Sequence, residues 1–123
     1  MNKQQNGFTV DSHFSSKDQV VRRIYDRLLK AIQQIGPVIE EPKKTSIHLV
    51  NANALAGVAT RKDSLILTIK SDRKLVSARV YKSEQISANR FHHEVRLRPL
   101  ADVDSELTGW LRDAYRLSSN RGR

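Results

Sequence analysis

Apolar residues recur every three or four positions along residues 20–35, which is the spacing of one buried face of an α-helix. Ser16 and Gln19 precede this stretch with the spacing of a capping box, in which side chains satisfy backbone N–H groups at the start of a helix. We expect Gly36 to form a left-handed cap at its end and Pro37 to prevent a further turn. The expected buried positions are Val20, Val21, Ile24, Leu28, Ala31, Ile32 and Ile35.

A second helical pattern covers residues 102–117 and places large apolar side chains on one face. Its beginning is acidic and its last turn is basic, which is the distribution of charge that the helix dipole favours. We therefore attribute Asp102, Asp104 and Glu106 to the start of a helix rather than to a metal or acid–base site. The expected buried positions are Val103, Leu107, Trp110, Leu111, Ala114 and Leu117.

Between the two helical patterns the period changes to two, which is typical of strands with one buried face. Gly57 falls inside one such segment, where glycine marks a bulge or the close approach of another group to the backbone. In the fifth segment we expect Ala78 and Val80 to face inward. The expected strands cover residues 38–41, 44–50, 54–60, 64–70, 77–82 and 87–98.

Short strands joined by short turns favour antiparallel neighbours, because parallel pairing needs a crossover of a dozen or more residues. We therefore expect an α+β fold: an antiparallel meander of five or six strands with the N- and C-terminal helices packed on one face, as a two-layer α-β5-α sandwich. We expect residues 8–118 to form a single domain, after a flexible lead-in at 1–7 and before a basic tail at 119–123. The core is expected to join Ile24, Leu28, Leu107, Trp110 and Leu111 to Ile47, Leu67, Ile69, Val95 and Leu97.

The segment 87–98 has apolar side chains at alternate positions and basic side chains between them. Its apolar side includes His93, which we interpret as a hydrogen-bonded structural histidine, and its polar side includes a single carboxylate, Glu94. Ordinary solvation would explain each outward cation singly, but together they favour contact with phosphate groups. The residues expected on this outward face are His48, Lys70, Arg79, Tyr81, His92, Arg96 and Arg98.

The formal net charge of +9 favours nucleic acid or another polyanion as the partner. The chain has no cysteine, which excludes disulfides, thiolate nucleophiles and cysteine-ligated metals. No apolar run approaches the roughly 20 residues that cross a bilayer, so we expect no membrane contact and a cytoplasmic protein.

We expect a binding domain, monomeric or homodimeric, rather than an enzyme, because no phosphate-binding glycine loop or serine elbow occurs. His92 and His93 are adjacent on a strand and point to opposite faces, so we expect no metal and no cofactor. Two alternatives stay open: a small hydrolase or nuclease that uses His48, His92 and Glu94, or a module for protein interaction or homodimerisation. The candidate binding residues are Lys44, His48, Arg61, Lys62, Lys70, Arg79, Tyr81, Arg90, His92, Arg96 and Arg98.

Several short motifs are spread over nearly the whole chain: Ile24-Tyr-Asp-Arg-Leu28, Pro42-Lys-Lys-Thr-Ser-Ile-His48, Ala56-Gly-Val58 with Arg61-Lys62, Asn89-Arg-Phe-His-His93 and Gly109-Trp-Leu-Arg-Asp-Ala-Tyr115. Together they resemble a bacterial family of domains of unknown function, some members of which are labelled as predicted transport proteins. Some members of that family carry a zinc-ribbon-like segment before the domain, from which this cysteine-free chain departs.

The order of helices and strands is also similar to the frataxin-like and YjbR-like folds. Frataxins bind iron through an acidic ridge on the first helix. The corresponding helix here carries Arg22, Arg23, Arg27 and Lys30, so the resemblance does not imply iron delivery. The YjbR-like branch is described as DNA-binding, and this resemblance implies the same for the chain at the level of fold.

Overall fold

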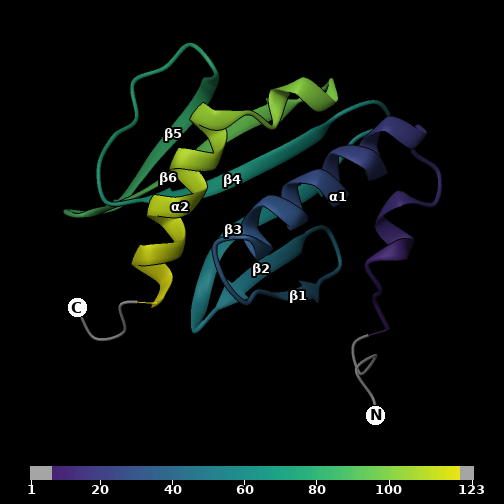
Figure 1. The fold of residues 1–123 in the computed structure, drawn as a ribbon, viewed down its shortest axis with the longest axis horizontal. Helices are drawn as coiled ribbons and strands as arrows, with labels where there is room; N and C mark the ends of the chain where they lie inside the picture. Colours follow the sequence, from purple (N-terminus) through teal and green to yellow (C-terminus); the bar gives the residue numbers. More distant parts are fainter. Residues whose placement is uncertain (1–6, 120–123) are drawn as a thin grey trace.

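Two helices cover one face of a six-stranded antiparallel sheet and leave the other face open (Figure 1). The computed structural model describes residues 7–119. The helices are α1 (Gln19–Gln33) and α2 (Ser105–Ser119), and single 3₁₀ turns lie at Asp11–Phe14 (η1) and Leu100–Asp102 (η2). This is the two-layer α+β architecture expected from the sequence.

The strands are β1 (Ile39–Pro42), β2 (Ile47–Asn51), β3 (Asn53–Thr60), β4 (Leu65–Ser71), β5 (Val80–Ser87) and β6 (Arg90–Leu97). Their order in the sheet is β1-β2-β3-β4-β6-β5, and every neighbouring pair is antiparallel. The first four strands form the expected meander. The last two depart from it, because β6 lies between β4 and β5.

The side chains of the last two strands explain this order. In β6, His93, Val95 and Leu97 are buried under the helices, whereas β5 has no buried residue. A strand with little to bury is suited to the edge of the sheet, where charged residues such as Lys82 also discourage pairing with other chains.

The boundaries of β5 and β6 differ from the expected ones. The expected strand at 77–82 begins only at Val80 and continues to Ser87, and the expected strand at 87–98 begins only at Arg90. Ala78 was expected to face inward and is exposed, because it precedes the strand. The exposed second half of β5 has no apolar alternation, and this is why its continuation could not be seen in the sequence.

Two expectations for α1 are wrong. Its N-cap is Asp18 rather than Ser16, because the Asp18 N–H donates to the Lys62 carbonyl in the β3–β4 turn and fixes where the helix begins. Gly36 is not in the left-handed region. A side chain at Gly36 would instead collide with Tyr115, whose hydroxyl donates to the Pro37 carbonyl at 2.7 Å. The glycine therefore makes room for α2 rather than capping α1.

The core lies between the sheet and the helices. Its expected members are buried, with the exception of Trp110, which is half-buried and lies with the Arg79 guanidinium 5.9 Å from its ring centre. Tyr25 of α1 is fully buried and was not among the expected residues. The expected members that are fully buried are Ile24, Leu28, Leu107, Leu111, Ile47, Leu67, Ile69, Val95 and Leu97.

The expected lead-in at 1–7 and basic tail at 119–123 lie outside the described residues, apart from Gly7 and Ser119. Ser119 belongs to α2. Over residues 7–119, no helix combines the length and apolar character needed to cross a membrane.

Candidate functional site

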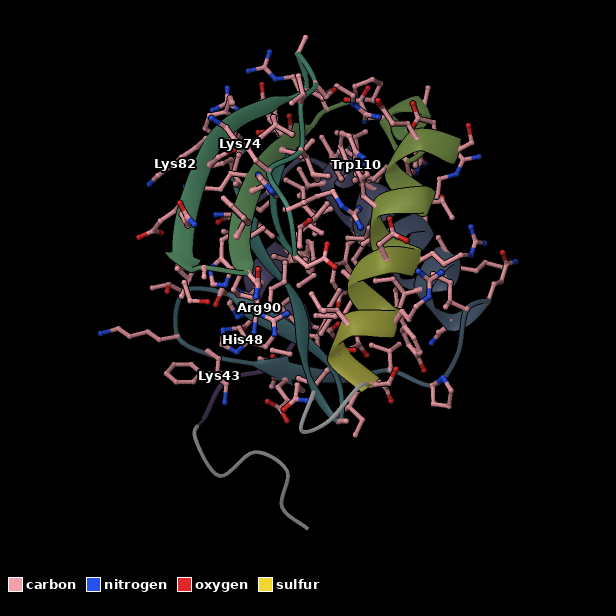
Figure 2. The ribbon with its side chains drawn as sticks, turned by 90° about the vertical axis from the view of Figure 1, so that its left-hand side faces the viewer. Lys43, His48, Lys74, Lys82, Arg90 and Trp110 are labelled. Atoms are coloured by element: carbon pink, nitrogen blue, oxygen red, sulfur yellow. The ribbon has the colours of Figure 1, made fainter. Side chains whose placement is uncertain are left out.

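Alternation along the strands determines which side chains reach the open face, the face of the sheet that the helices do not cover. Figure 2 shows Lys82 pointing away from α2, and Trp110 between the sheet and α2. The strand register aligns one row of outward residues across the sheet, each opposite the next on the neighbouring strand. This row consists of Glu41, His48, Gly57, Thr68, Glu94 and Lys82.

A groove with a volume of about 340 Å³ lies in the open face, and we call it the Gly57 groove. Its sides carry His48 from β2, Lys70 from β4 and His92 from β6. Its size is within the range of about 300–1,000 Å³ that is common for small-molecule sites. The lining residues are Ser46, His48, Ala54, Ala56, Gly57, Val58, Ala59, Thr68, Lys70 and His92.

Small residues in β3 form the floor of this groove. Gly57 and Ala59 face outward, opposite Thr68 and Ile66 of β4. Ala56 and Val58 are buried toward the helices, so they line the groove through their main chain. The floor is therefore a strip of nearly bare peptide backbone between two sides that carry cationic and imidazole groups.

Gly57 has no structural reason to be glycine. Its φ angle is not in the left-handed region, and a Cβ atom added to it would meet nothing within 4 Å. The irregularity in this part of the sheet lies between Leu49 and Val50, not at Gly57, so the expected bulge is not at this residue. Glycine inside a strand costs about 0.5–1 kcal/mol relative to alanine, and the chain's own packing does not recover this cost. The second expectation from the sequence, a close approach of another group, is not met by any of the described residues, because the position is open.

Cations gather at one side of the Gly57 groove. Lys70 lies opposite His92 in the β4–β6 ladder, and both are half-buried. Burial lowers the pKa of Lys70, and the charge of Arg90 lowers it further. Burial also lowers the pKa of His92, and the charge of Lys70 adds to this effect. The fold thus holds these groups together although they repel one another.

The other end of the open face is built around Glu94. An irregularity between Val80 and Lys82 turns both Tyr81 and Lys82 toward it. The Tyr81 hydroxyl donates to Glu94 at 2.9 Å, and Lys82 Nζ lies 4.0 Å from the same carboxylate. Arg96 stacks on the Tyr81 ring at 5.8 Å. Arg96 and Tyr81 are exposed here, as expected, but Glu94 is already engaged by these neighbours.

Arg79 was expected on the outward face, and this expectation is wrong. It precedes β5 and turns toward α2, where it pairs with Asp104 at 2.8 Å and Glu106 at 3.2 Å. It also donates to the Asp102 carbonyl at 2.5 Å. The acidic start of α2 thus binds an internal cation, and the charge of Arg79 serves the fold.

The remaining candidate residues lie at the margins of the open face. Lys44, Arg61 and Arg98 are exposed beyond the ends of β2, β3 and β6. Lys62 pairs with Asp18 at 3.2 Å, so it is less available than its neighbour Arg61. These residues border the face but do not line the Gly57 groove.

Sequence reasoning missed two carboxylates on the open face. Glu41 lies opposite His48 and is 3.9 Å from Lys43, and Glu84 lies opposite His92. Their places could not be read without knowing that β1 pairs with β2 and that β5 pairs with β6. The face is therefore less uniformly basic than expected. Beside the Gly57 groove, Lys70 and Arg90 lie without an ion-paired carboxylate of residues 7–119.

His93 has the structural role expected of it. It is fully buried, and its Nδ1 lies 2.8 Å from the Ser83 hydroxyl. Its Nε2 lies 3.3 Å from the Leu75 amide and 3.2 Å from the Arg73 carbonyl. His93 therefore ties the long β4–β5 connection to β6.

The structure does not bring His48, His92 and Glu94 into one catalytic group. His48 and His92 line the same groove, but their strands are three spacings apart, about 14 Å, and strand side chains stand roughly perpendicular to the sheet. Among the described residues, neither imidazole has a hydrogen-bond partner, so nothing there orients His48 or His92 as a base. The three residues therefore do not form the group that the hydrolase alternative requires.

Among residues 7–119, no three histidine or acidic side chains are grouped closely enough to hold a metal ion. A family model described as a domain of unknown function, DUF5655, matches residues 10–118 of the chain. No curated protein and no solved structure matches it.

Proposed function

This chain belongs to the family of the domain of unknown function DUF5655, and we propose that its open face binds nucleic acid through the phosphate backbone, without strong sequence preference. The observation that carries the proposal is the group of Lys70, Arg90 and His92 beside the Gly57 groove. Burial and the charge of Arg90 lower the pKa of Lys70. Burial and the charge of Lys70 lower the pKa of His92, which the nearby Glu84 raises. Neither Lys70 nor Arg90 lies within ion-pair distance of a carboxylate of residues 7–119. A phosphate would relieve this repulsion.

Other basic residues of the chain contrast with this group. Arg22, Arg73, Arg79 and Arg116, which lie outside the open face, each pair with at least one carboxylate. Cations already paired within the chain contribute little to the attraction of a polyanion. Arg23 and Lys30 on α1 are exposed and have no ion pair within the described residues, so a lack of pairing alone does not set the open face apart. What distinguishes Lys70 and Arg90 is their place beside the Gly57 groove.

The two alternatives are less well supported. A hydrolase would need a third group to orient His48 or His92, and Glu94 is held by Tyr81 instead. A homodimer joined face to face would bring the Lys70 cluster toward its own copy, which is unfavourable. The resemblance to YjbR-like folds, described as DNA-binding, agrees with the proposal, and the transport label adds no residue to it.

A salt titration of binding tests the proposal. We expect the wild-type protein to bind labelled single-stranded and double-stranded DNA and RNA at about 50 mM salt, and the binding constant to fall steeply as salt increases. Replacing Lys70→Gln together with Arg90→Gln should weaken binding to all sequences and reduce the salt slope by about two, if each cation neutralises one phosphate.

The matched control is Arg23→Gln with Lys30→Gln, which removes the same charge from exposed positions on α1. If both double variants weaken binding equally, net charge and not the open face attracts the nucleic acid. Absence of binding by the wild-type protein at about 50 mM salt would also overturn the proposal.

A further inference from the structure

The Gly57 groove is a hollow of about 340 Å³, and contact with phosphate alone does not require such a hollow. Its floor at Gly57 and Ala59 is nearly bare backbone, and its cations stand only at the sides. A phosphate backbone lying over a flat cationic sheet would need no such hollow. The floor therefore suits an uncharged part of the same ligand.

We propose that this groove receives an unpaired nucleobase, and thus that the protein prefers single-stranded nucleic acid; this inference rests on the proposed function. A base is flat and could lie against the strip of β3 main chain at Gly57. The adjoining phosphate would then meet Lys70 and Arg90, whose charges have no carboxylate partner among residues 7–119. The aromatic rings of His48 and His92 would flank the base from opposite sides.

A duplex does not offer this ligand, because its bases are paired and stacked within the helix. It would meet only the cations at the rim of the face. The glycine explains why the groove is open at its floor. Any larger side chain at position 57 would project into the groove, and no other described residue fills this space. Gly57 thus makes the strand less stable than an alanine would, and it keeps the floor of the groove open.

The direct test fills the groove. Gly57→Val adds a side chain that strands favour, at a position where a Cβ atom meets nothing within 4 Å, so the variant should fold at least as stably as the wild type. Binding to a labelled single strand of about 12 nucleotides should weaken about tenfold. Binding to the duplex of the same sequence should stay within about twofold.

Gly109→Val is the matched control. It makes the same chemical change at a helical glycine of α2 where a Cβ atom also meets nothing within 4 Å, in the layer on the other side of the sheet. It should leave binding to both probes unchanged. Thermal unfolding of each variant verifies the fold, and Ala59→Val, which fills the same floor, replaces Gly57→Val if that variant is unstable.

The outcomes separate this inference from the proposed function. If folded Gly57→Val binds the single strand as tightly as the wild type does, the groove does not bind a base. The proposed function, which depends on charge, would not be affected by that result. Equal affinity of the wild type for single strand and duplex would also overturn the inference. If the wild type binds neither probe at about 50 mM salt, the proposed function itself fails.

Discussion

Tyr25 shows how a single residue can be central to this fold without contributing to the apolar pattern of its helix. It is fully buried, and its hydroxyl donates to Glu40 of β1 at 2.5 Å. Burial raises the pKa of Tyr25 well above its usual value, and the carboxylate of Glu40 adds to the shift. The apolar pattern predicted which aliphatic side chains face the core. It could not predict the contact between Tyr25 and Glu40, because this contact depends on how α1 packs against the edge strand β1.

Replacing Tyr25→Phe tests this hydrogen bond. The change should lower the free energy of unfolding by about 1.5–3 kcal/mol, because the acceptor is charged and loses its donor. Urea denaturation measures the difference. Tyr81→Phe is the control, since its hydroxyl also donates to a carboxylate but its side chain is exposed, and it should change stability by about 0.5 kcal/mol or less. Equal effects of the two changes would show that burial does not strengthen the Tyr25 contact.

His92 reports the electrostatic state of the Gly57 groove. Its pKa is lowered by burial and by Lys70, so Lys70→Gln should raise it, while Lys30→Gln on α1 should not. NMR titration of the His92 imidazole signals measures its pKa in both variants. The unfolded chain takes up this proton first, near pH 6.5, so the stabilising contribution of neutral His92 is present above that pH and is lost as the pH falls through the lowered folded pKa. An unchanged His92 pKa in Lys70→Gln would contradict the proximity of the two groups.

Among the elements, the start of α2 illustrates where sequence patterns were sufficient. As predicted, Glu106 lies in the first turn of a helix, and Asp104 accepts the Leu107 N–H at 3.0 Å just before it. The expected start at residue 102 is wrong, because Asp102 lies in η2 and α2 begins at Ser105. The pattern could not show that Arg79 would join them, because that contact depends on where β5 begins. It also could not give the order of β5 and β6, since alternation defines the buried face of a strand but not its neighbour.

Asp104→Ala should destabilise the protein by about 0.5–2 kcal/mol through loss of the helix cap. Asp104→Asn keeps an oxygen that can accept the Leu107 N–H and should cost less. The Leu107 N–H lowers the pKa of Asp104 most, and Arg79 lowers it further, so its contribution is present above about pH 4 and is lost as the pH falls through the lowered pKa. Denaturation at neutral and acidic pH measures this, and a penalty that stays constant down to acid pH would contradict the assignment.

For the whole molecule, composition indicated a polyanion partner but not the place where it would bind. Alternation on single strands predicted seven of the eleven candidate residues, and it misplaced Arg79 among them. The groove lies across β2, β3, β4 and β6 and exists only once these strands are paired in register. The bare floor at Gly57 was visible in the sequence only as a glycine inside a strand. Strand order and register, which create the site, are long-range properties that local patterns do not contain.

The central claim is that the open face, and not the helix layer, binds nucleic acid. Backbone amide shifts recorded by NMR during titration with a short single-stranded oligonucleotide test it most directly. We expect the largest changes at His48, Gly57, Lys70 and His92, which line one groove, and little change along the exposed side of α1. Changes concentrated on α1 and α2, or no changes at about 50 mM salt, would contradict the account.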